Sequence, residues 1–380
     1  MCLKTLTSTQ KASRNSFTPG EIWPDASGLH INAHGGGFIH HECVYYWFGE
    51  HKVEGDAGNR AEVGVGVYSS RDLYNWQNEG IALSVSDDPK SDIARGCILE
   101  RPKVIYNAKS KQFVMWFHLE LAGQGYSAAR VGIATSDHVT GPYRFLRSLR
   151  PNAGRWPLNV GAEEKYPPSE EDAARLGELS RPEGPKVREV IQLLNRRDHV
   201  GGQMSRDMTL FVDDDGTAYH VAASEENATL NISRLTDDFL STTGEYIRVF
   251  PGRFHEAPAI FKAAGRYYMI SSDCTGWVPN AARLSTAPKM FGPWTEIGNP
   301  CVGEKLAVDT TFESQSTYVI PVAGIPNAFI FAADRWRPDN AIDGRYVWLP
   351  MQFDDSGVPF LRWHRSWGLA VFSSGDENCR

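Results

Sequence analysis

The sequence lacks the features that mark membrane proteins, zinc modules and disulfide-rich secreted domains. Its 380 residues include six cysteines, none in a C-x-x-C pair, so a zinc ribbon or thioredoxin-like motif is not expected. Cys43 and Cys97 lie in or beside apolar strands and should be reduced core residues. No run of about 20 apolar residues suggests a transmembrane helix. The first 20 residues are polar and lack a signal-peptide core. We therefore expect a cytoplasmic protein with no membrane partner, or a secreted one if the chain has been trimmed of a leader.

The chain also carries little excess charge. Its formal net charge is -7, so a nucleic-acid partner would need a local basic patch. The one basic cluster, residues 188–197, alternates with acidic and apolar residues and predicts the surface of a helix, so no nucleic-acid partner is expected. Aromatic residues are plentiful, with 11 Trp and 14 Tyr. Most should pack in a core, but a surplus of Trp also suits a surface that stacks on the apolar faces of sugars.

Three acidic residues stand at matching places in the chain. Glu100, Asp207 and Glu256 each come directly before an apolar strand, which a short turn joins to a second apolar strand. A carboxylate at the head of a strand points out of the end of a sheet and not into its core. The three hairpins therefore predict one repeated unit that presents carboxylates to a common place.

Successive units begin near residues 31, 100, 205, 256 and 311, and each contains four short predicted strands. Self-similarity on this scale is typical of a β-propeller, here an all-β fold of five blades. We expect an N-terminal arm over 1–28, a single propeller domain over 29–370 and a C-terminal tail over 371–380.

The stretch from about 151 to 200 interrupts the repeats between the second and third blades. It is rich in proline and charge. A capped helix is predicted from Pro168 to about Leu179, and apolar residues at helical spacing predict another from Pro185 to Asn195. The stretch is too short for a second domain, so we interpret it as a partly helical insertion.

In a propeller, the residues at the start of the first strand of each blade, here called the strand heads, lie close together. The first strand of each blade lines the central channel, so the residues at its head converge from different blades. Like charges crowded in one cleft raise at least one pKa, and a carboxyl group that stays protonated near neutral pH can act as a general acid. Two such groups, one protonated and one not, are the arrangement that hydrolyses glycosidic bonds. The residues at the strand heads are Asn32, Glu100, Asp207, Glu256 and Gln315.

Stretches spread over all five units carry a family resemblance: Ile31–Gly37, Tyr45–Glu50, Glu100–Asn107, Met115–His118, Ser205–Phe211, Glu225–Leu230, Glu256–Pro258, Cys274–Trp277, Ser314–Thr317 and Asp334–Trp336. On these residues the whole chain resembles glycoside hydrolase family 43, the inverting five-bladed propellers. It is most similar to the exo-β-1,3-galactanase subgroup (galactan 1,3-β-galactosidases). The resemblance implies a hydrolase that releases galactose from the non-reducing end of β-1,3-galactan, such as the backbone of arabinogalactan, or from galacto-oligosaccharides.

The resemblance also implies catalytic roles. Glu256 stands where the family keeps its general acid, and Asp207 where it keeps the acid that tunes the pKa of that group. The family's usual general base is an Asp of the first blade, but this chain has no carboxylate there, at Asn32. In the galactanase subgroup a Gln of the fifth blade or a Glu of the second positions the water, which are Gln315 and Glu100 here. Gln315 is favoured by the resemblance and Glu100 by its pKa as a base; the alternative role of Glu100 is to bind a substrate hydroxyl.

Further residues are implied as contacts of the terminal galactose. Trp277 would be a stacking floor for the sugar, although a Trp packed within a blade is an equal alternative. Glu225 and Glu226 follow the second strand of the third blade, so at least one should face the channel. The implied substrate-binding residues are Glu50, Tyr126, Asn227, Thr275, Trp277 and Asn32.

No cofactor or metal site is predicted. His34 falls near the expected channel axis, where we expect a structural role; the fold can hold a structural calcium there, which we do not predict. Residues 213–216 read Asp-Asp-Asp-Gly and invite a calcium interpretation. They lack the downstream Glu of an EF-hand loop, and Asp-Gly favours a hairpin turn.

Two other functions stay open. The same fold could act on an α-L-arabinofuranoside or a β-xyloside. It could also be a propeller that only binds glycans, because the first-blade Asp is absent. The presence of both Glu256 and Asp207 favours catalysis, since a binding protein has no need of that pair.

Overall fold

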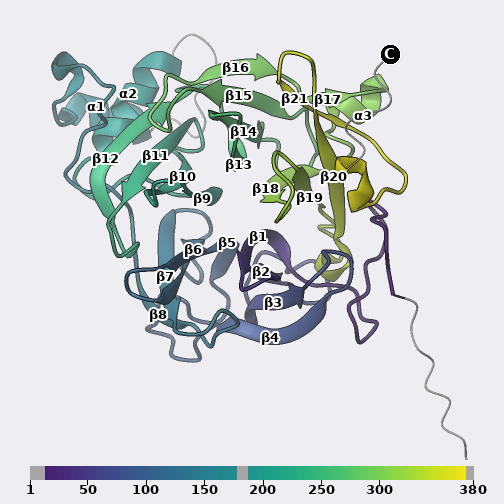
Figure 1. Cartoon of the computed structure of the whole chain (residues 1–380). Helices are drawn as coiled ribbons and strands as arrows, with labels where there is room; N and C mark the ends of the chain where they lie inside the picture. Colours follow the sequence, from purple (N-terminus) through teal and green to yellow (C-terminus); the bar gives the residue numbers. More distant parts are fainter. Residues whose placement is uncertain (1–12, 178–186, 374–380) are drawn as a thin grey trace, which may run out of the picture.

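The structure, a computed structural model, describes residues 13–177 and 187–373. Its strands form five separate sheets, each built largely from consecutive antiparallel strands. The sheets are arranged around a central axis as the blades of a propeller (Figure 1). The expected all-β, five-bladed fold is confirmed.

Each blade runs from an inner strand at the axis to an outer strand at the rim. The first blade contains β1 (His34–His41), β2 (Val44–His51), β3 (Gly64–Ser70) and β4 (Gln77–Ser84). The second contains β5 (Ile98–Asn107), β6 (Gln112–Glu120), β7 (Arg130–Ser136) and β8 (Arg144–Leu149). The third contains β9 (Met208–Val212), β10 (Ala218–Ser224), β11 (Thr229–Leu235) and β12 (Thr242–Val249). The fourth contains β13 (Glu256–Ala263), β14 (Arg266–Ser272), β15 (Arg283–Ala287) and β16 (Thr295–Gly298).

The fifth blade has an extra strand. Its antiparallel strands are β18 (Gln315–Pro321), β19 (Phe329–Arg335), β20 (Arg345–Phe353) and β21 (Pro359–Arg362), and the short β17 (Cys301–Val302) pairs in parallel with β21. The helix α3 (Lys305–Asp309) links β17 to β18. The inner strands β1, β5, β9, β13 and β18 contact one another in sequence, and β1 contacts β18. This ring of contacts brings their heads to one mouth of the channel.

An aromatic cluster seals the first blade against the fifth. The rings of Trp47 and Trp348 lie 5.0 Å apart, and Phe17 lies 4.3 Å from Trp367. The backbones of Phe17 and Trp367 exchange two hydrogen bonds, at 2.8 and 3.1 Å. Phe17 and Trp23 are both buried. The described part of the predicted arm therefore packs into the propeller, while residues 1–12 and 374–380 lie outside the described residues.

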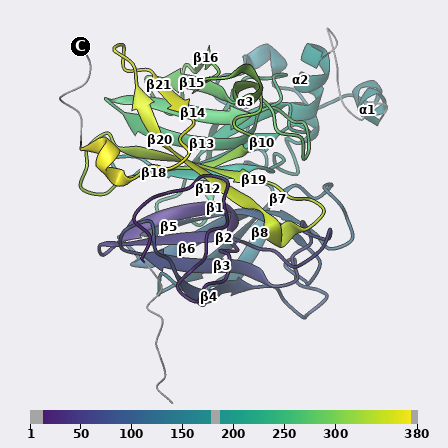
Figure 2. The same cartoon turned by 90° about the vertical axis from the view of Figure 1, so that its right-hand side faces the viewer.

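The insertion between β8 and β9 is partly helical. It contains a 3-10 turn (Ala162–Glu164) and the helices α1 (Glu170–Gly177) and α2 (Val187–Arg197). Both helices project from one face of the ring (Figure 2).

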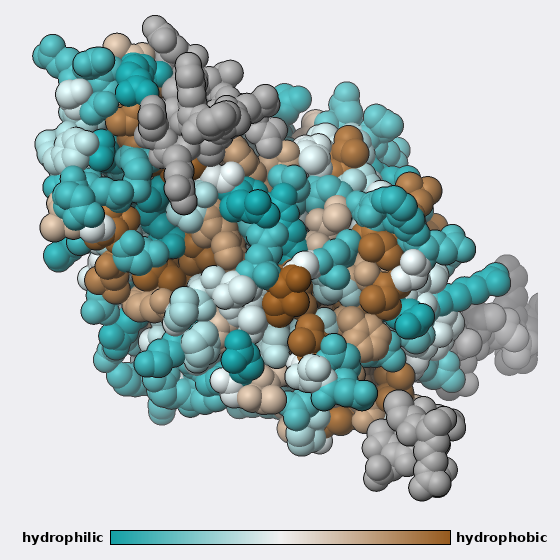
Figure 3. Space-filling model, turned by 90° about the horizontal axis from the view of Figure 1, so that it is seen from above, coloured by the Kyte–Doolittle hydropathy of each residue, from teal (hydrophilic) through white to brown (hydrophobic). Residues whose placement is uncertain are grey.

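The surface seen in Figure 3 is largely hydrophilic, with small scattered apolar patches. Leu179, the predicted end of the first helix, lies outside the described residues. None of the described helices is long and apolar enough to cross a membrane.

One expectation about the first blade is wrong. Cys43 is exposed, whereas Cys97 is buried as expected. Cys43 lies in the turn between β1 and β2 with a φ of 63°. A residue in a tight turn between two strands projects beyond both faces of the sheet, so an apolar neighbourhood in the sequence did not bury its side chain.

Candidate active site

The inner strands of blades two and four share a local distortion at their heads. The pairing of each with its neighbour shifts register just after its first acid, Glu100 in β5 and Glu256 in β13. The next residue is left-handed in both, with φ of 54° at Arg101 and 52° at Ala257. A bulge re-aims side chains at the end of a strand. Both acids are thereby turned toward the mouth of the channel.

The strand heads and adjoining loops enclose a cavity of about 310 Å³. Most residues predicted from the sequence line it: Glu50, Glu100, Tyr126, Asp207, Asn227, Glu256, Trp277 and Gln315. It is also lined by Asn59, Arg101, His118, Arg206, Gly276 and Trp336, for which no role was predicted. The structure therefore brings together side chains from all five blades.

Two residues predicted to bind substrate do not line this cavity. The amide of Asn32 pairs with the backbone of Lys52, donating to its carbonyl and accepting from its N–H, both at 2.8 Å. The hydroxyl of Thr275 accepts from Asn280 Nδ2 at 2.7 Å and donates to the carbonyl of Val278. Both side chains hold backbone at the rim of the site, so their binding role stays a prediction.

Glu256 is placed to hold a proton. Burial and the negative charge of Asp207 raise the pKa of Glu256 to about 7. Asn227 Nδ2 donates to Glu256 Oε1 at 2.6 Å, which makes Oε1 an acceptor oxygen. A carboxyl group with these properties suits a general acid.

Asp207 links the general-acid candidate to the centre of the site. Its Oδ2 accepts a hydrogen bond from the backbone N–H of Ala257 at 3.0 Å and pairs with the Arg101 guanidinium at 2.9 Å. Because Ala257 directly follows Glu256, the first of these bonds fixes the head of β13 against Asp207. The charge of Asp207 is therefore held beside Glu256, as its predicted tuning role requires.

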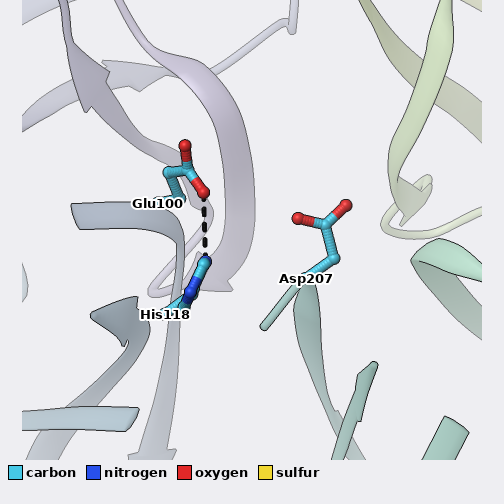
Figure 4. A group of neighbouring side chains, drawn as sticks. All are labelled: Glu100, His118 and Asp207. Atoms are coloured by element: carbon cyan, nitrogen blue, oxygen red, sulfur yellow. Dashed lines mark hydrogen bonds and ion pairs between the residues drawn. The ribbon is translucent and has the colours of Figure 1, made fainter. Parts of the chain in front are cut away.

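Glu100 has the opposite environment (Figure 4). Its Oε2 faces His118 Nδ1 at 3.0 Å, and its Oε1 accepts from the Tyr126 hydroxyl at 2.8 Å. Burial opposes a charge on His118, but its hydrogen bonds to Glu100 and Glu120 raise its pKa to about 9. Burial would likewise raise the pKa of Glu100, yet the hydrogen bond and charge of His118 lower it to about 2. A carboxylate so stabilised is a weak base, which favours the hydroxyl-binding role of Glu100.

The Gln315 amide is held in one orientation. Its Oε1 accepts from Arg101 at 2.6 Å and from the Trp336 indole at 3.0 Å. Its Nε2 donates to the Ser272 hydroxyl at 2.9 Å, and its second N–H makes no hydrogen bond with the described residues. This second N–H is therefore the group that can hold a water or a sugar hydroxyl.

Glu100, His118 and Asp207 are close enough to raise the question of a metal ion, with one candidate ligand atom of each within 4.8 Å of the others. The surrounding donors do not suit one. Both His118 nitrogens face carboxylates at 3.0 Å, and a protonated imidazole has no lone pair to offer. Asp207 is already paired with Arg101. The arrangement is that of a charged hydrogen-bond network.

Two other sequence features have structural settings. His34 is buried, stacks on Tyr346 at 5.4 Å and lies 3.9 Å from Asp334; burial lowers its pKa well below the usual value. In the hairpin turn at 213–216, Asp213 and Asp214 share the ammonium group of Lys262, at 2.7 and 2.8 Å. The ammonium group of Lys262 neutralises these carboxylates, which is what a bound calcium ion would otherwise do.

Sequence reasoning assigned no role to Arg101, His118, Arg206 or Trp336. Arg101 directly follows Glu100, and in a regular strand the two side chains would point to opposite faces. The bulge turns both side chains into one cavity, so the two-residue alternation of a strand does not predict that Arg101 faces the site. His118 pairs with Glu100 across β5 and β6, a contact that could have been found by aligning the predicted hairpin.

Comparisons with known proteins find glycoside hydrolases, in agreement with the pair of acids in the cavity. The family model described as Glycosyl hydrolases family 43 matches residues 182–320. A curated protein named β-D-galactofuranosidase, from Aspergillus niger, is 28% identical over 150 residues, which are 37% of this chain and 43% of that protein. The match therefore spans less than half of this curated relative.

Solved structures cover nearly the whole chain. A family 43 β-1,3-galactosidase with galactodeoxynojirimycin is 54% identical, with a TM-score of 0.87, over 93% of this chain and 100% of that chain. Exo-β-1,3-galactanase from Phanerochaete chrysosporium, in a variant with β-1,3-galactotriose, is 30% identical, with a TM-score of 0.73, over 94% and 68%. The enzyme from Clostridium thermocellum is 31% identical, with a TM-score of 0.73, over 93% and 66%. On this evidence the chain belongs to glycoside hydrolase family 43.

Proposed function

We propose that the protein is an inverting exo-glycosidase that releases galactose from the non-reducing end of β-1,3-galactan and of β-1,3-galacto-oligosaccharides. The observation that carries the proposal is Glu256, a carboxyl group whose pKa is raised to about 7 at the wall of a polar cavity. The names of the similar solved structures support the substrate.

In the proposed reaction Glu256 gives its proton to the glycosidic oxygen as the bond to the anomeric carbon breaks. Asp207 keeps this proton available at neutral pH through its charge. A water attacks the anomeric carbon from the opposite face of the sugar and gives one of its protons to solvent water, so the product has the inverted α configuration. Galactose then leaves, and Glu256 takes up a proton from solvent.

We assign the holding of the attacking water to Gln315. Its second N–H can donate to the water oxygen, and the bonds from Arg101 and Trp336 to its Oε1 keep the amide in that orientation. Glu100 is assigned to a sugar hydroxyl, because two hydrogen bonds and a low pKa make it a poor base.

The cavity suits one terminal sugar. Its volume of about 310 Å³ is at the small end of ligand pockets. Trp277 has 46% of its surface exposed and meets Trp336 edge to face at 5.8 Å. Trp336 also lies beside the guanidinium of Arg101, at 5.7 Å, so the more exposed Trp277 is the indole to which we assign the stacking of the galactose ring.

Hydrolysis of β-1,3-galactobiose and galactotriose, followed by proton NMR at early times, tests the proposal. We expect α-galactose to appear first and to convert to the β anomer by mutarotation. Initial β-galactose would contradict inversion. No release of galactose from either sugar would overturn the substrate assignment.

A furanoside is the second candidate substrate, because the curated relative is named a β-D-galactofuranosidase. Initial rates on aryl β-D-galactopyranoside, β-D-galactofuranoside, α-L-arabinofuranoside and β-D-xyloside would rank the candidates. A binding-only role predicts no turnover of any of them, with saturable binding of galacto-oligosaccharides.

A further inference from the structure

The helical insertion is attached to the blade that carries part of the active site. Gln192 of α2 accepts a hydrogen bond from Arg248 of β12 at 2.9 Å. The same guanidinium makes two bonds to Glu225, at 2.6 and 2.7 Å. Glu225 is fully buried and does not line the cavity. The helix is therefore fixed to the turn that follows β10, one residue before Glu226 and two before Asn227.

A second attachment lies at the end of α2. Arg197 NH1 donates to Glu226 Oε1 at 2.9 Å, and Asp198 holds the other side of the guanidinium at 2.8 and 2.9 Å. The remaining oxygen of Glu226 accepts from Arg206 at 3.0 Å. Arg206 lines the cavity and also donates to the carbonyl of Tyr126 at 2.6 Å. Glu226 thus joins an arginine of the insertion to an arginine of the site.

The contacts continue to the general-acid candidate. Arg206 NH1 donates to Asn227 Oδ1 at 3.4 Å, and Asn227 Nδ2 donates to Glu256 Oε1 at 2.6 Å. Only one orientation of the amide satisfies both bonds. Residues 225–227 all have left-handed backbone, with φ of 54°, 54° and 66°, a conformation that is unfavourable for the two glutamates, although asparagine adopts it more readily. The bonds from Arg248 to Glu225 and from Arg197 to Glu226 therefore support this turn.

We propose that the insertion is a catalytic support and that Arg197 is a positioning residue: through Glu226 and Arg206 it holds the Asn227 amide that orients the general acid Glu256. Arg197 itself does not line the cavity. The inference rests on the proposed function, because it assumes that Glu256 protonates a leaving group. It assigns to the insertion a role in the chemical step.

The test compares two substrates that differ in their need for an acid. From β-1,3-galactobiose the leaving group is the hydroxyl oxygen of the second galactose, which needs a proton, whereas 2,4-dinitrophenyl β-galactoside loses a stable phenolate that needs none. In Arg197→Met we expect kcat on galactobiose to fall by about tenfold, and kcat on the dinitrophenyl galactoside to change by less than about twofold. The bond from Asn227 lowers the pKa of Glu256, so loosening it should move the alkaline limb of the pH profile to higher pH.

The matched control is Arg196→Met, one residue earlier in the same helix. Arg196 stacks on Tyr166 at 3.6 Å and donates to the carbonyl of Glu164, both within the insertion. We expect this variant to keep wild-type rates on both substrates. Glu226→Gln, which weakens both arginine contacts, should reproduce the substrate-dependent loss, and Arg197→Lys should restore part of the galactobiose rate.

The outcomes separate the two proposals. Equal rates and pH profiles in Arg197→Met and Arg196→Met would overturn the positioning role. An equal loss on both substrates, together with a lowered melting temperature, would also overturn it, because general destabilisation does not depend on the leaving group. A wild-type protein that hydrolyses neither galactoside would overturn the proposed function, and the inference with it.

Discussion

Glu100 and Glu256 occupy the same place in blades two and four but have opposite surroundings. Each begins or nearly begins an inner strand, precedes a left-handed residue and faces one cavity. Glu100 lies beside a protonated His118 and the Tyr126 hydroxyl, which lower its pKa to about 2. Glu256 is buried beside Asp207, which raises its pKa to about 7. The repeat therefore determines where a carboxyl group points, while its neighbours determine what it can do.

Removing the proton of Glu256 should lower the rate more than any other change considered below. Glu256→Gln keeps the shape but cannot donate the proton, so kcat on galactobiose should fall by about 10²- to 10⁴-fold. The loss on 2,4-dinitrophenyl β-galactoside should be much smaller, since that leaving group needs no acid. Steady-state kinetics on both substrates measure the difference. Unchanged turnover of galactobiose would exclude Glu256 as the acid.

Removing the negative charge of Asp207 should reduce the difference in pKa between Glu256 and Glu100. In Asp207→Asn the negative charge is lost, so the pKa of Glu256 should fall by about one unit or more. Because the acid form exists only below that pKa, the alkaline limb of kcat against pH should move to lower pH. A limb that stays in place, with the fold intact by circular dichroism, would show that burial alone raises the pKa.

A smaller effect is expected from neutralising the other acid. If Glu100 binds a sugar hydroxyl, Glu100→Gln loses one charged hydrogen bond, or about 1.5–3 kcal/mol, and kcat/KM should fall by about 10- to 100-fold. Rates with and without added azide provide the check. Rescue by azide, with formation of α-galactosyl azide, would instead identify Glu100 as the base.

The smallest effect concerns stability. The pKa of His118 is raised from 6.5 to about 9 in the folded state. The stability that its charge contributes is therefore fully present below pH 6.5 and is lost as the pH rises through 9. The melting temperature of the wild type should fall over this window, and that of His118→Gln should fall less. Thermal unfolding at several pH values measures both; parallel curves would mean that His118 is neutral in the fold.

Much of this arrangement could be predicted from the chain. The repeated hairpins predicted Glu100, Asp207 and Glu256 at one mouth of a five-bladed ring, because the apolar strands and the spacing of the repeats can be recognised in the sequence. The raised pKa of Glu256 could not be predicted, since it depends on contact with Asp207 of a different blade. Arg101, which meets Gln315 and Asp207, faces the cavity only because of a bulge that periodicity does not reveal.

The paired backbones of Phe17 and Trp367 have a consequence for biosynthesis. Contacts between residues far apart in sequence form slowly, because a long loop must close first. While the chain emerges from the ribosome, the first blade can assemble its own hairpins, but the aromatic surface around Trp47 has no partner from the fifth blade until the last strands are translated. A nascent chain is therefore exposed to aggregation and to chaperones until the ring is completed.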